Sequence, residues 1–207
     1  MQMMNEQEKF WHSKFGNEYS KRLPVKKLVK NNTVFFNKIF KKKRDIKNLV
    51  ELGANNGANI ISLKKVLKKL KKISAVEINQ NACKNLRNIK HVEVHNQSIS
   101  DCNLNFKFDL VLLKGVLIHI NPNQLNKIYK KINSLASKYV LFAEYYNSYP
   151  IKINYRGYKN KLFKRDFAGE FTKKFKNFKI IDYGFVYNKD KYPQDDLTWF
   201  LMKKTRS

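Results

Sequence analysis

The stretch Lys47–Ile61 constrains the fold more strongly than the rest of the sequence. A short apolar run ends in the acid Glu51, glycines follow at Gly53 and Gly57, and an apolar, Lys-rich helical pattern starts directly afterwards. This order predicts a strand, a tight turn and the N-terminus of a helix. Glycine permits positive φ and close approach of a ligand, and the first N–H groups of a helix lack partners. The turn is therefore predicted to hold a ligand.

A second acid, Glu77, lies near the end of the next apolar run, Lys72–Ile78, where a carboxylate can accept both hydroxyls of a ribose. A dinucleotide fingerprint would need another glycine near Asn55, and no Gly-Lys-Ser/Thr follows for a phosphate loop. The spacing therefore favours a nucleoside without a pyrophosphate. A purely structural use of the two glycines, in a tight turn, stays open.

Composition narrows the class of protein. A chain of 207 residues fits one α/β domain, and apolar runs are broken well before a membrane span is reached. The polar N-terminus does not look like a signal peptide, so we expect a cytoplasmic protein. Cys83 and Cys102 lack the spacing of a zinc site, so no metal is expected.

The net charge of +27 invites nucleic acid or an anionic membrane as a partner. Lysine is spread over nearly every predicted helix and arginine is scarce. Arginine is the residue that preferentially makes bidentate hydrogen bonds to phosphates and bases. Composition bias of the whole coding sequence is therefore an equally good explanation of the charge.

The periodicity predicts alternating strands and helices, which implies a parallel sheet with helices on both faces. Strands are expected near 47–52, 72–78, 91–95, 108–113 and 138–144, helices near 57–71, 79–88 and 122–134, and a C-terminal hairpin from 178–187 and 195–202. Upstream, Trp11, Phe15, Tyr19 and Arg22 fall on one face of a helix, and a second helix is expected from Pro24 to about residue 42. We divide the chain into an N-terminal helical lid, 1–44, and a main domain, 45–207.

The motifs carry a resemblance. Glu51–Gly57 resembles the first motif of class I S-adenosylmethionine (SAM) methyltransferases, and Val76–Asn79 resembles the second. The resemblance implies a three-layer α/β/α sandwich with a seven-stranded, mostly parallel Rossmann-like sheet of order 3-2-1-4-5-7-6. It also implies SAM as cofactor and S-adenosylhomocysteine (SAH) as product. The residues that it places at the cofactor are Tyr19, Arg22, Glu51, Gly53, Ala54, Asn55, Gly57, Asn59, Glu77, Ile78, Ser98, Ile99, Lys114, Gly115, Val116 and His119.

Some of these residues have a specific expected role. Arg22 can make a bidentate ion pair with the carboxylate of the SAM methionine, and Tyr19 can line the path of the methyl group. Ser98 stands where an acid commonly contacts the adenine. His119 is a candidate general base, because a histidine near neutral pKa can remove a proton from the attacking hydroxyl or amine. An alternative is that His119 only packs.

The end of the fifth predicted strand is expected to form the acceptor site. Tyr145 and Tyr146 are candidate catalytic residues beside His119. Aromatic rings beside donors are the usual surface for gripping a sugar or an anion. The expected acceptor-binding residues are Trp11, Asn147, Tyr155, Arg156, Lys164 and Arg165.

A closer resemblance covers nearly the whole chain. Its motifs, which include Phe10-Trp11, Lys114–Pro122, Ala143–Asn147, Tyr155–Gly157, Leu162–Glu170, Asp182–Phe185 and Pro193–Phe200, are similar to those of methyltransferases associated with pseudaminic acid biosynthesis. This similarity implies methylation of a hydroxyl or amine on an acidic or nucleotide-linked surface sugar, with a small-molecule sugar or nucleotide sugar as substrate. Two alternatives stay open: a SAM-dependent RNA methyltransferase, and a non-catalytic basic module that binds nucleic acid.

Overall fold

A computed structural model describes residues 4–22, 24–41 and 45–205 of the chain. Its internal contacts divide the chain into two compact units, which are described separately. The first unit comprises residues 1–103 and the second comprises residues 104–207. No helix among the described residues is both long and apolar enough to cross a membrane. The cytoplasmic location stays a prediction.

The first unit contains a three-stranded parallel sheet in the order β3-β2-β1. Its elements are α1 (Glu6–His12), α2 (Lys14–Lys21), α3 (Val25–Phe40), β1 (Asn48–Leu52), α4 (Ala58–Val66), β2 (Lys72–Val76), α5 (Gln80–Arg87) and β3 (Glu93–His95). Leu52 of β1 is in register with Val76 of β2, so both strands end at the same edge of the sheet. Ligands of parallel sheets bind at this carboxyl edge.

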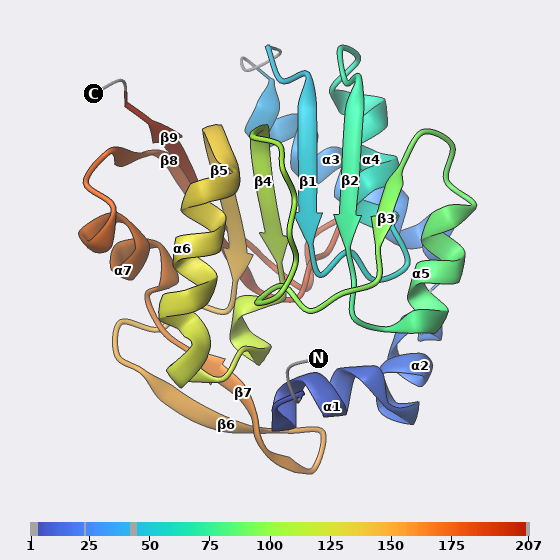
Figure 1. The fold of residues 1–207 in the computed structure, drawn as a ribbon, viewed down its shortest axis with the longest axis vertical. Helices are drawn as coiled ribbons and strands as arrows, with labels where there is room; N and C mark the ends of the chain where they lie inside the picture. The colour runs from blue at the N-terminus through green and yellow to red at the C-terminus, as the bar shows by residue number, and fades with distance from the viewer. Residues whose placement is uncertain (1–3, 23, 42–44, 206–207) are drawn as a thin grey trace. The chain divides into compact units, whose positions relative to one another are not determined.

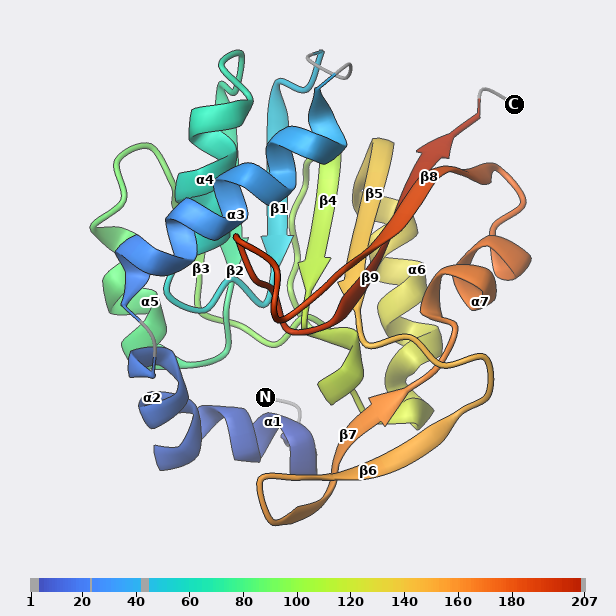
Figure 2. The ribbon, with the colours of Figure 1, turned by 180° about the vertical axis from the view of Figure 1, so that it is seen from behind.

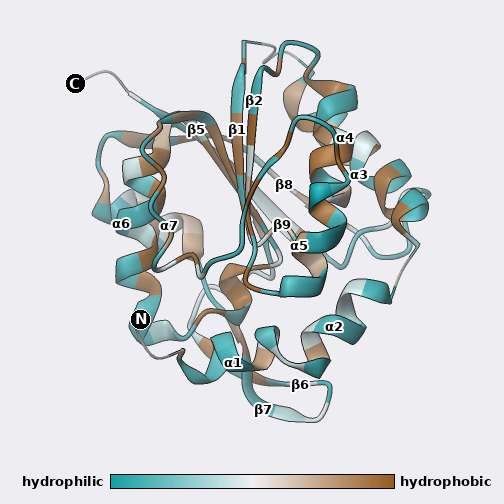
Figure 3. Cartoon of the chain, turned by 45° about the vertical axis from the view of Figure 1, so that its right-hand side comes forward, coloured by the Kyte–Doolittle hydropathy of each residue, from teal (hydrophilic) through white to brown (hydrophobic). Residues whose placement is uncertain are grey.

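Helices α3 and α4 pack together on one face of this small sheet (Figures 1 and 2). The apolar residues of α3 recur at helical spacing, and Val29, Phe36 and Phe40 are buried. Helix α5 is mostly hydrophilic on the side seen in Figure 3, while Ala82, Cys83 and Leu86 form its buried face. The predicted boundary between residues 44 and 45 adjoins residues 42–44, which lie outside the described residues, and it stays a prediction.

The predicted single helix through Arg22 is wrong, because the chain breaks at Ser13. Ser13 has extended backbone angles and is both the C-cap of α1 and the N-cap of α2. Its hydroxyl donates to Phe10 O at 2.8 Å and accepts from Phe15 N at 3.3 Å. Serine competes for backbone groups in this way, which favours a cap over a helix interior.

The second unit contains a four-stranded sheet in the order β4-β5-β9-β8. Strands β4 and β5 are parallel, whereas β9 is antiparallel to both β5 and β8, so the C-terminal hairpin is confirmed. Helix α6 packs on β4 and β5, and α7 packs on β8. The elements are β4 (Phe108–Lys114), the 3-10 helices η1 (Leu117–His119) and η2 (Pro122–Gln124), α6 (Leu125–Leu135), β5 (Ala136–Glu144), β6 (Ile151–Tyr155), β7 (Tyr158–Lys164), α7 (Phe167–Lys174), β8 (Phe178–Val186) and β9 (Leu197–Lys204).

Over the whole chain the main sheet has seven strands in the order β3-β2-β1-β4-β5-β9-β8. The predicted α/β fold with a seven-stranded, mostly parallel sheet is confirmed. Strands β9 and β8 stand where the prediction has its strands 7 and 6. The numbers differ because β6 and β7 form a separate two-stranded sheet that the sequence analysis did not predict.

Candidate functional site

The turn after β1 has the strained geometry that its glycines predict. Gly53 and Gly57 have φ of 78° and 79°, and Asn55 between them has φ of 46°. The N–H groups of Gly53 and Ala54 both donate to Val76 O, at 2.8 and 3.1 Å. A Cβ on Gly57 would lie 2.3 Å from Cδ1 of Ile89, so only glycine fits where the turn opens α4. The turn therefore lies folded against the end of β2.

Glu51 is 1% exposed at the end of β1 and is held by a chain of amides. Asn59 Nδ2 on α4 donates to Glu51 Oε1 at 2.6 Å, and Asn32 Nδ2 on α3 donates to Asn59 Oδ1 at 2.8 Å. The predicted site residues Glu51 and Asn59 are thus in direct contact, and Asn32 is an additional member that the sequence analysis did not single out.

Glu77 follows β2 and contacts the same turn. Its Oε2 accepts from the N–H of Asn55 at 2.8 Å, and its Oε1 accepts from the N–H of Asn79 at 2.7 Å. Burial raises the pKa of this carboxyl, while the N–H donors of Asn79 and Asn55 act in the opposite direction. The structure thus brings together Glu77, Ile78 beside it and the Gly53–Gly57 turn, as the spacing predicts.

Asn79 is a buried residue that connects this edge to the N-terminal helices, and the sequence analysis assigned it no role. Its Oδ1 caps α5 by accepting from Ala82 N at 2.9 Å. Its Nδ2 donates to Trp11 O at 3.0 Å and to Asn17 Oδ1 at 2.9 Å. An asparagine directly before a helix is a recognisable N-cap signal, but its second set of contacts is tertiary.

The N-terminal aromatic residues form a cluster across the break at Ser13. The ring centroid of Trp11 lies 5.6 Å from that of Phe15 and 5.1 Å from that of Tyr19. Arg22 is exposed and its N–H caps α2 by donating to Tyr19 O at 3.2 Å. Trp11 and Tyr19 are therefore brought together, and Arg22 follows them at the helix end.

The turn after β3 contains Ser98 and Ile99, and it contacts α1. The hydroxyl of Ser98 donates to Oε1 of Glu8, and Glu8 Oε2 accepts from Asn5 N at 2.9 Å. The carboxylate of Glu8 thus lies beside Ser98, the position where the resemblance would expect an acid. The Asn5-Glu8 capping box is visible in the sequence, but its contact with Ser98 is not.

In the second unit, Glu144 is the acid at the end of β5, and the sequence analysis gave it no role. It is 3% exposed, and its carboxylate accepts from Val116 N at 3.0 Å, Leu117 N at 3.1 Å and Ile118 N at 3.4 Å. Burial raises its pKa to about 7, although these N–H groups oppose the shift. The carboxylate therefore fixes the chain where Lys114, Gly115 and Val116 leave β4.

His119 ends η1 and is 6% exposed. Its Nδ1 lies 2.6 Å from the carbonyl oxygen of Lys161, which can only accept, so Nδ1 carries the proton and Nε2 the lone pair. Burial lowers its pKa to about 4, while the contact with Lys161 acts in the opposite direction. The ring of Tyr155 lies 4.8 Å from the imidazole. The imidazole is therefore neutral at physiological pH.

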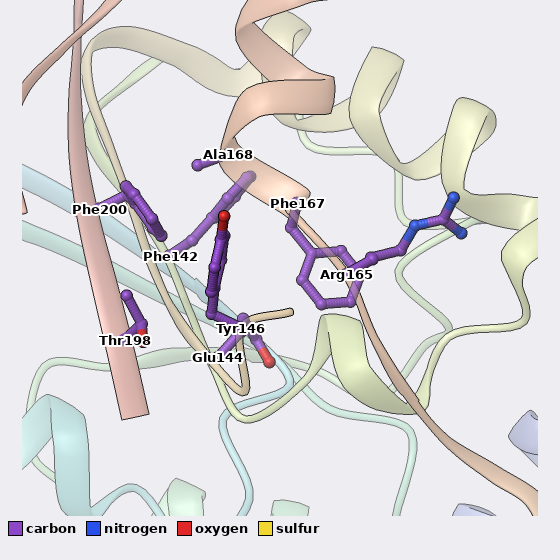
Figure 4. A pocket seen from close by; sticks show the side chains of 8 residues that line it. All are labelled: Phe142, Glu144, Tyr146, Arg165, Phe167, Ala168, Thr198 and Phe200. Carbon is purple, nitrogen blue, oxygen red and sulfur yellow. The ribbon is translucent and has the colours of Figure 1, made fainter. Parts of the chain in front are cut away.

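A small pocket lies beside Tyr146 (Figure 4). Arg165 extends away from Tyr146 in this view, and its Nε donates to Glu170 Oε1 at 2.6 Å. Tyr129 donates to the other oxygen of Glu170 at 3.0 Å. The lining is largely aromatic and consists of Phe142, Glu144, Tyr146, Arg165, Phe167, Ala168, Thr198 and Phe200.

The remaining predicted acceptor residues of the second unit lie on or beside the β6–β7 hairpin. Lys164 Nζ lies 5.3 Å from the ring centroid of Tyr145, and the Arg156 guanidinium lies 5.6 Å from that of Tyr155. Asn147 Nδ2 donates to Tyr149 O at 2.6 Å. Trp11 belongs to the first unit, and its contacts there are those of the aromatic cluster.

Comparison with solved structures identifies the fold as that of SAM-dependent methyltransferases. One match is a 1,6-didemethyltoxoflavin N1-methyltransferase from Burkholderia thailandensis with bound SAH, at TM-score 0.68 and 14% identity over 100% of this chain and 93% of that chain. A SAM-dependent methyltransferase from Leishmania major matches at TM-score 0.68 and 13% identity, over 97% of this chain and 86% of that chain.

A third match is the magnesium protoporphyrin IX methyltransferase from Synechocystis PCC 6803 with bound SAM, at TM-score 0.68 and 12% identity over 99% of this chain and 100% of that chain. At these identities the likeness establishes the fold. No family model and no curated protein matches the sequence. The predicted fold of class I SAM methyltransferases is thus confirmed, and the predicted enzyme class and cofactor are those of the proteins that share it.

Proposed function

We propose that the protein is a SAM-dependent methyltransferase. The observation that carries the proposal is the Glu77 carboxylate, whose two oxygens are oriented by Asn55 N and Asn79 N at the carboxyl edge of the sheet. A carboxylate has about four acceptor sites, so these donors leave capacity for a ribose hydroxyl. The positive φ of Gly53 and Gly57 bends the adjoining turn so that its backbone can lie against a ligand.

Other residues of the first unit would hold the rest of the cofactor. The Gly53–Gly57 turn would bind the methionine and ribose part, and Ser98 with Ile99 would contact the adenine. Tyr19 and Arg22 would cover the methionine carboxylate from α2. When bound, SAM supplies an activated methyl group on a sulfonium, so this chain needs only to orient the acceptor, exclude water and accept a proton.

The second unit offers His119 as the group that accepts this proton. Its Nδ1–H is fixed by Lys161 O, which leaves Nε2 as the basic nitrogen. A pKa of about 4 keeps the imidazole neutral but makes it a weak base. Tyr145, whose ring centroid lies 5.3 Å from Lys164 Nζ, and Tyr146 are the alternative candidates.

We further propose that the acceptor is a hydroxyl or amine of an acidic or nucleotide-linked sugar. Exposed Arg156 and half-buried Lys164 beside tyrosine rings support a ligand that is both ring-shaped and anionic. Arg165 supports it less, because it is paired with Glu170. The solved structures that share the fold include methyltransferases for 1,6-didemethyltoxoflavin and for magnesium protoporphyrin IX, so the sugar rests on the sequence motifs. RNA is the second candidate, favoured by the net charge of +27.

Calorimetric titration of SAM and SAH into the purified protein tests the enzyme class. We expect micromolar binding, and at least about a tenfold loss of SAM affinity in Glu77→Ala. Glu18→Ala is a matched control, because Glu18 is an exposed acid on α2. Absence of binding to the wild type, or equal binding to Glu77→Ala, would overturn the proposal. Nucleotide sugars and RNA are then screened for the gain of one methyl mass.

A further inference from the structure

The segment Tyr145–Arg165 carries an unusual concentration of tyrosine and positive charge. It contains five tyrosines and six basic residues, and no Asp or Glu. The basic residues are Lys152, Arg156, Lys159, Lys161, Lys164 and Arg165. The acids Glu144 and Asp166 lie only at its two ends. Lysine is common elsewhere in the chain, so the distinguishing feature of this segment is that its own sequence contains no acidic residue.

The segment folds into the β6–β7 hairpin, which lies apart from the other strands of the second unit (Figure 2). Its turn is formed by Arg156 and Gly157, with φ of 51° and 84°, values that match the tight turn of a two-residue hairpin. Leu162 and Phe163 are each 4% exposed and anchor β7. The hairpin is therefore anchored through the second half of β7, while the turn and much of β6 are exposed.

The hairpin contacts the candidate base through β7 and through the residue before its turn. His119 Nδ1 is bonded to Lys161 O, and the Tyr155 ring packs on the imidazole. A ligand that binds along the hairpin would therefore lie on the element that contacts His119. This connection makes the hairpin part of the acceptor site rather than a remote surface.

The exposed side chains suit an anionic glycan. Tyr149 is 76% exposed and Tyr158 is 47% exposed, so both rings offer apolar faces to a sugar ring. Lys152 and Lys159 are exposed and can pair with carboxylates. Exposed Asn154 can both donate to and accept from sugar hydroxyls. This mixture suits a carboxylated sugar, and the experiment below distinguishes it from a nucleic acid.

The length of the hairpin suits more than one sugar. Strand β7 runs from Tyr158 to Lys164 and spans roughly 20 Å, at about 3.3 Å per residue. A single sugar ring can contact only part of that length. We propose that the β6–β7 hairpin binds an anionic glycan chain of several sugar units and presents one of them for methylation. This inference rests on the proposed function and extends it from a single nucleotide sugar to a chain.

The test measures binding of the full-length protein to poly-α2,8-sialic acid, with dextran as the neutral polymer and monomeric sialic acid as the single unit. The hairpin variant is Lys152→Ala with Lys159→Ala. The matched control is Lys179→Ala with Lys189→Ala, which removes the same charge from exposed positions outside the hairpin. A third variant, Tyr149→Ser, removes an exposed ring. A SAM titration of each variant, made independently of the glycan measurement, shows whether the variant is folded with its proposed cofactor site intact.

We expect polysialic acid to bind more tightly than the monomer and dextran. Binding should fall about tenfold in the hairpin variant, about threefold in Tyr149→Ser, and by less than about twofold in the control, with SAM affinity unchanged. Equal losses in the hairpin and control variants would overturn the inference and leave net charge as the cause. Tighter binding of poly(uridylic acid) that depends on the same two lysines would overturn the glycan and make nucleic acid the partner. If the wild-type protein does not bind SAM, the proposed function is refuted instead.

Discussion

The Nδ2 atom of Asn79 donates a hydrogen bond to the backbone carbonyl of Trp11 at 3.0 Å. The backbone N–H of the same asparagine donates to Glu77. One residue therefore holds both the acid that we assign to the ribose and the helices that carry Trp11 and Tyr19. The position of α1 and α2 is thus coupled to the geometry of the Glu77 carboxylate.

Replacing Asn79 should release the N-terminal helices. Asn79→Ala removes the cap of α5 and both bonds to the N-terminal segment, so we expect a loss of about 1–3 kcal/mol in unfolding free energy, measured with urea. Asn79→Ser keeps a capping hydroxyl but is too short to reach Trp11 O. In both variants amide exchange in residues 5–22 should accelerate, and unchanged exchange in Asn79→Ser would contradict this role.

Gly16→Ala should destabilise the protein, although helix propensity alone predicts a gain of about 1 kcal/mol. A Cβ at this position would lie 1.9 Å from Trp11 O and 2.9 Å from Asn79 Nδ2, so α2 must move away from α1. Urea denaturation shows whether the substitution lowers the unfolding free energy, as the contact predicts, or raises it, as helix propensity predicts. Exposed Glu18 on the same helix supplies the control Glu18→Ala, which should stay within about 0.5 kcal/mol of the wild type.

Glu144 should make stability depend on pH. Its pKa is raised from 4.5 to about 7, so the folded protein retains a proton that the unfolded chain has already released. The stabilising contribution is complete below pH 4.5 and is lost as the pH rises through about 7. Glu144→Gln cannot ionise at this position, so its unfolding free energy lacks this pH dependence. The unfolding free energy of the wild type minus that of Glu144→Gln should therefore fall between about pH 5 and pH 8, and a rise over this range would contradict the shift.

His119 should stay neutral throughout the physiological pH range. Burial lowers its pKa to about 4, so stability is lost only as the pH falls from 6.5 toward that value. Nitrogen NMR of labelled histidine, assigned with His119→Gln, should show the Nδ1–H tautomer and a midpoint near 4. Titration near the ordinary value for histidine would show that the ring is accessible to solvent.

Residues whose function depends on local spacing were predictable from the sequence. Gly53, Gly57 and Glu77 lie where consecutive parallel strands end, so their meeting follows from strand periodicity and the common sheet edge. Asn79 and Glu8 carry local capping signals, but their contacts with Trp11 and Ser98 join residues 68 and 90 positions apart. No local rule gives such contacts.

The structure differs from the sequence prediction at the break in the N-terminal helix and at the β6–β7 hairpin, and periodicity reveals neither. The aromatic spacing of Trp11, Phe15 and Tyr19 persists across the break at Ser13, so periodicity alone cannot reveal it. The β6–β7 hairpin turns at Arg156-Gly157, and arginine at positive φ is not one of the usual turn signals. Arg165 was expected to bind the acceptor, but the sequence did not show that Glu170 would pair with it.

The two N–H groups that hold Glu77 have a consequence for selectivity. Fixing an unrestrained glutamate side chain in one rotamer costs up to about 2 kcal/mol of conformational entropy. These two hydrogen bonds already hold the Glu77 side chain in the folded protein, so a ligand does not have to order it. A diol that reaches this carboxylate meets lone pairs whose directions are set in advance. The side chain cannot turn to follow an epimer whose hydroxyls diverge, so rigidity at Glu77 would act as a stereochemical filter.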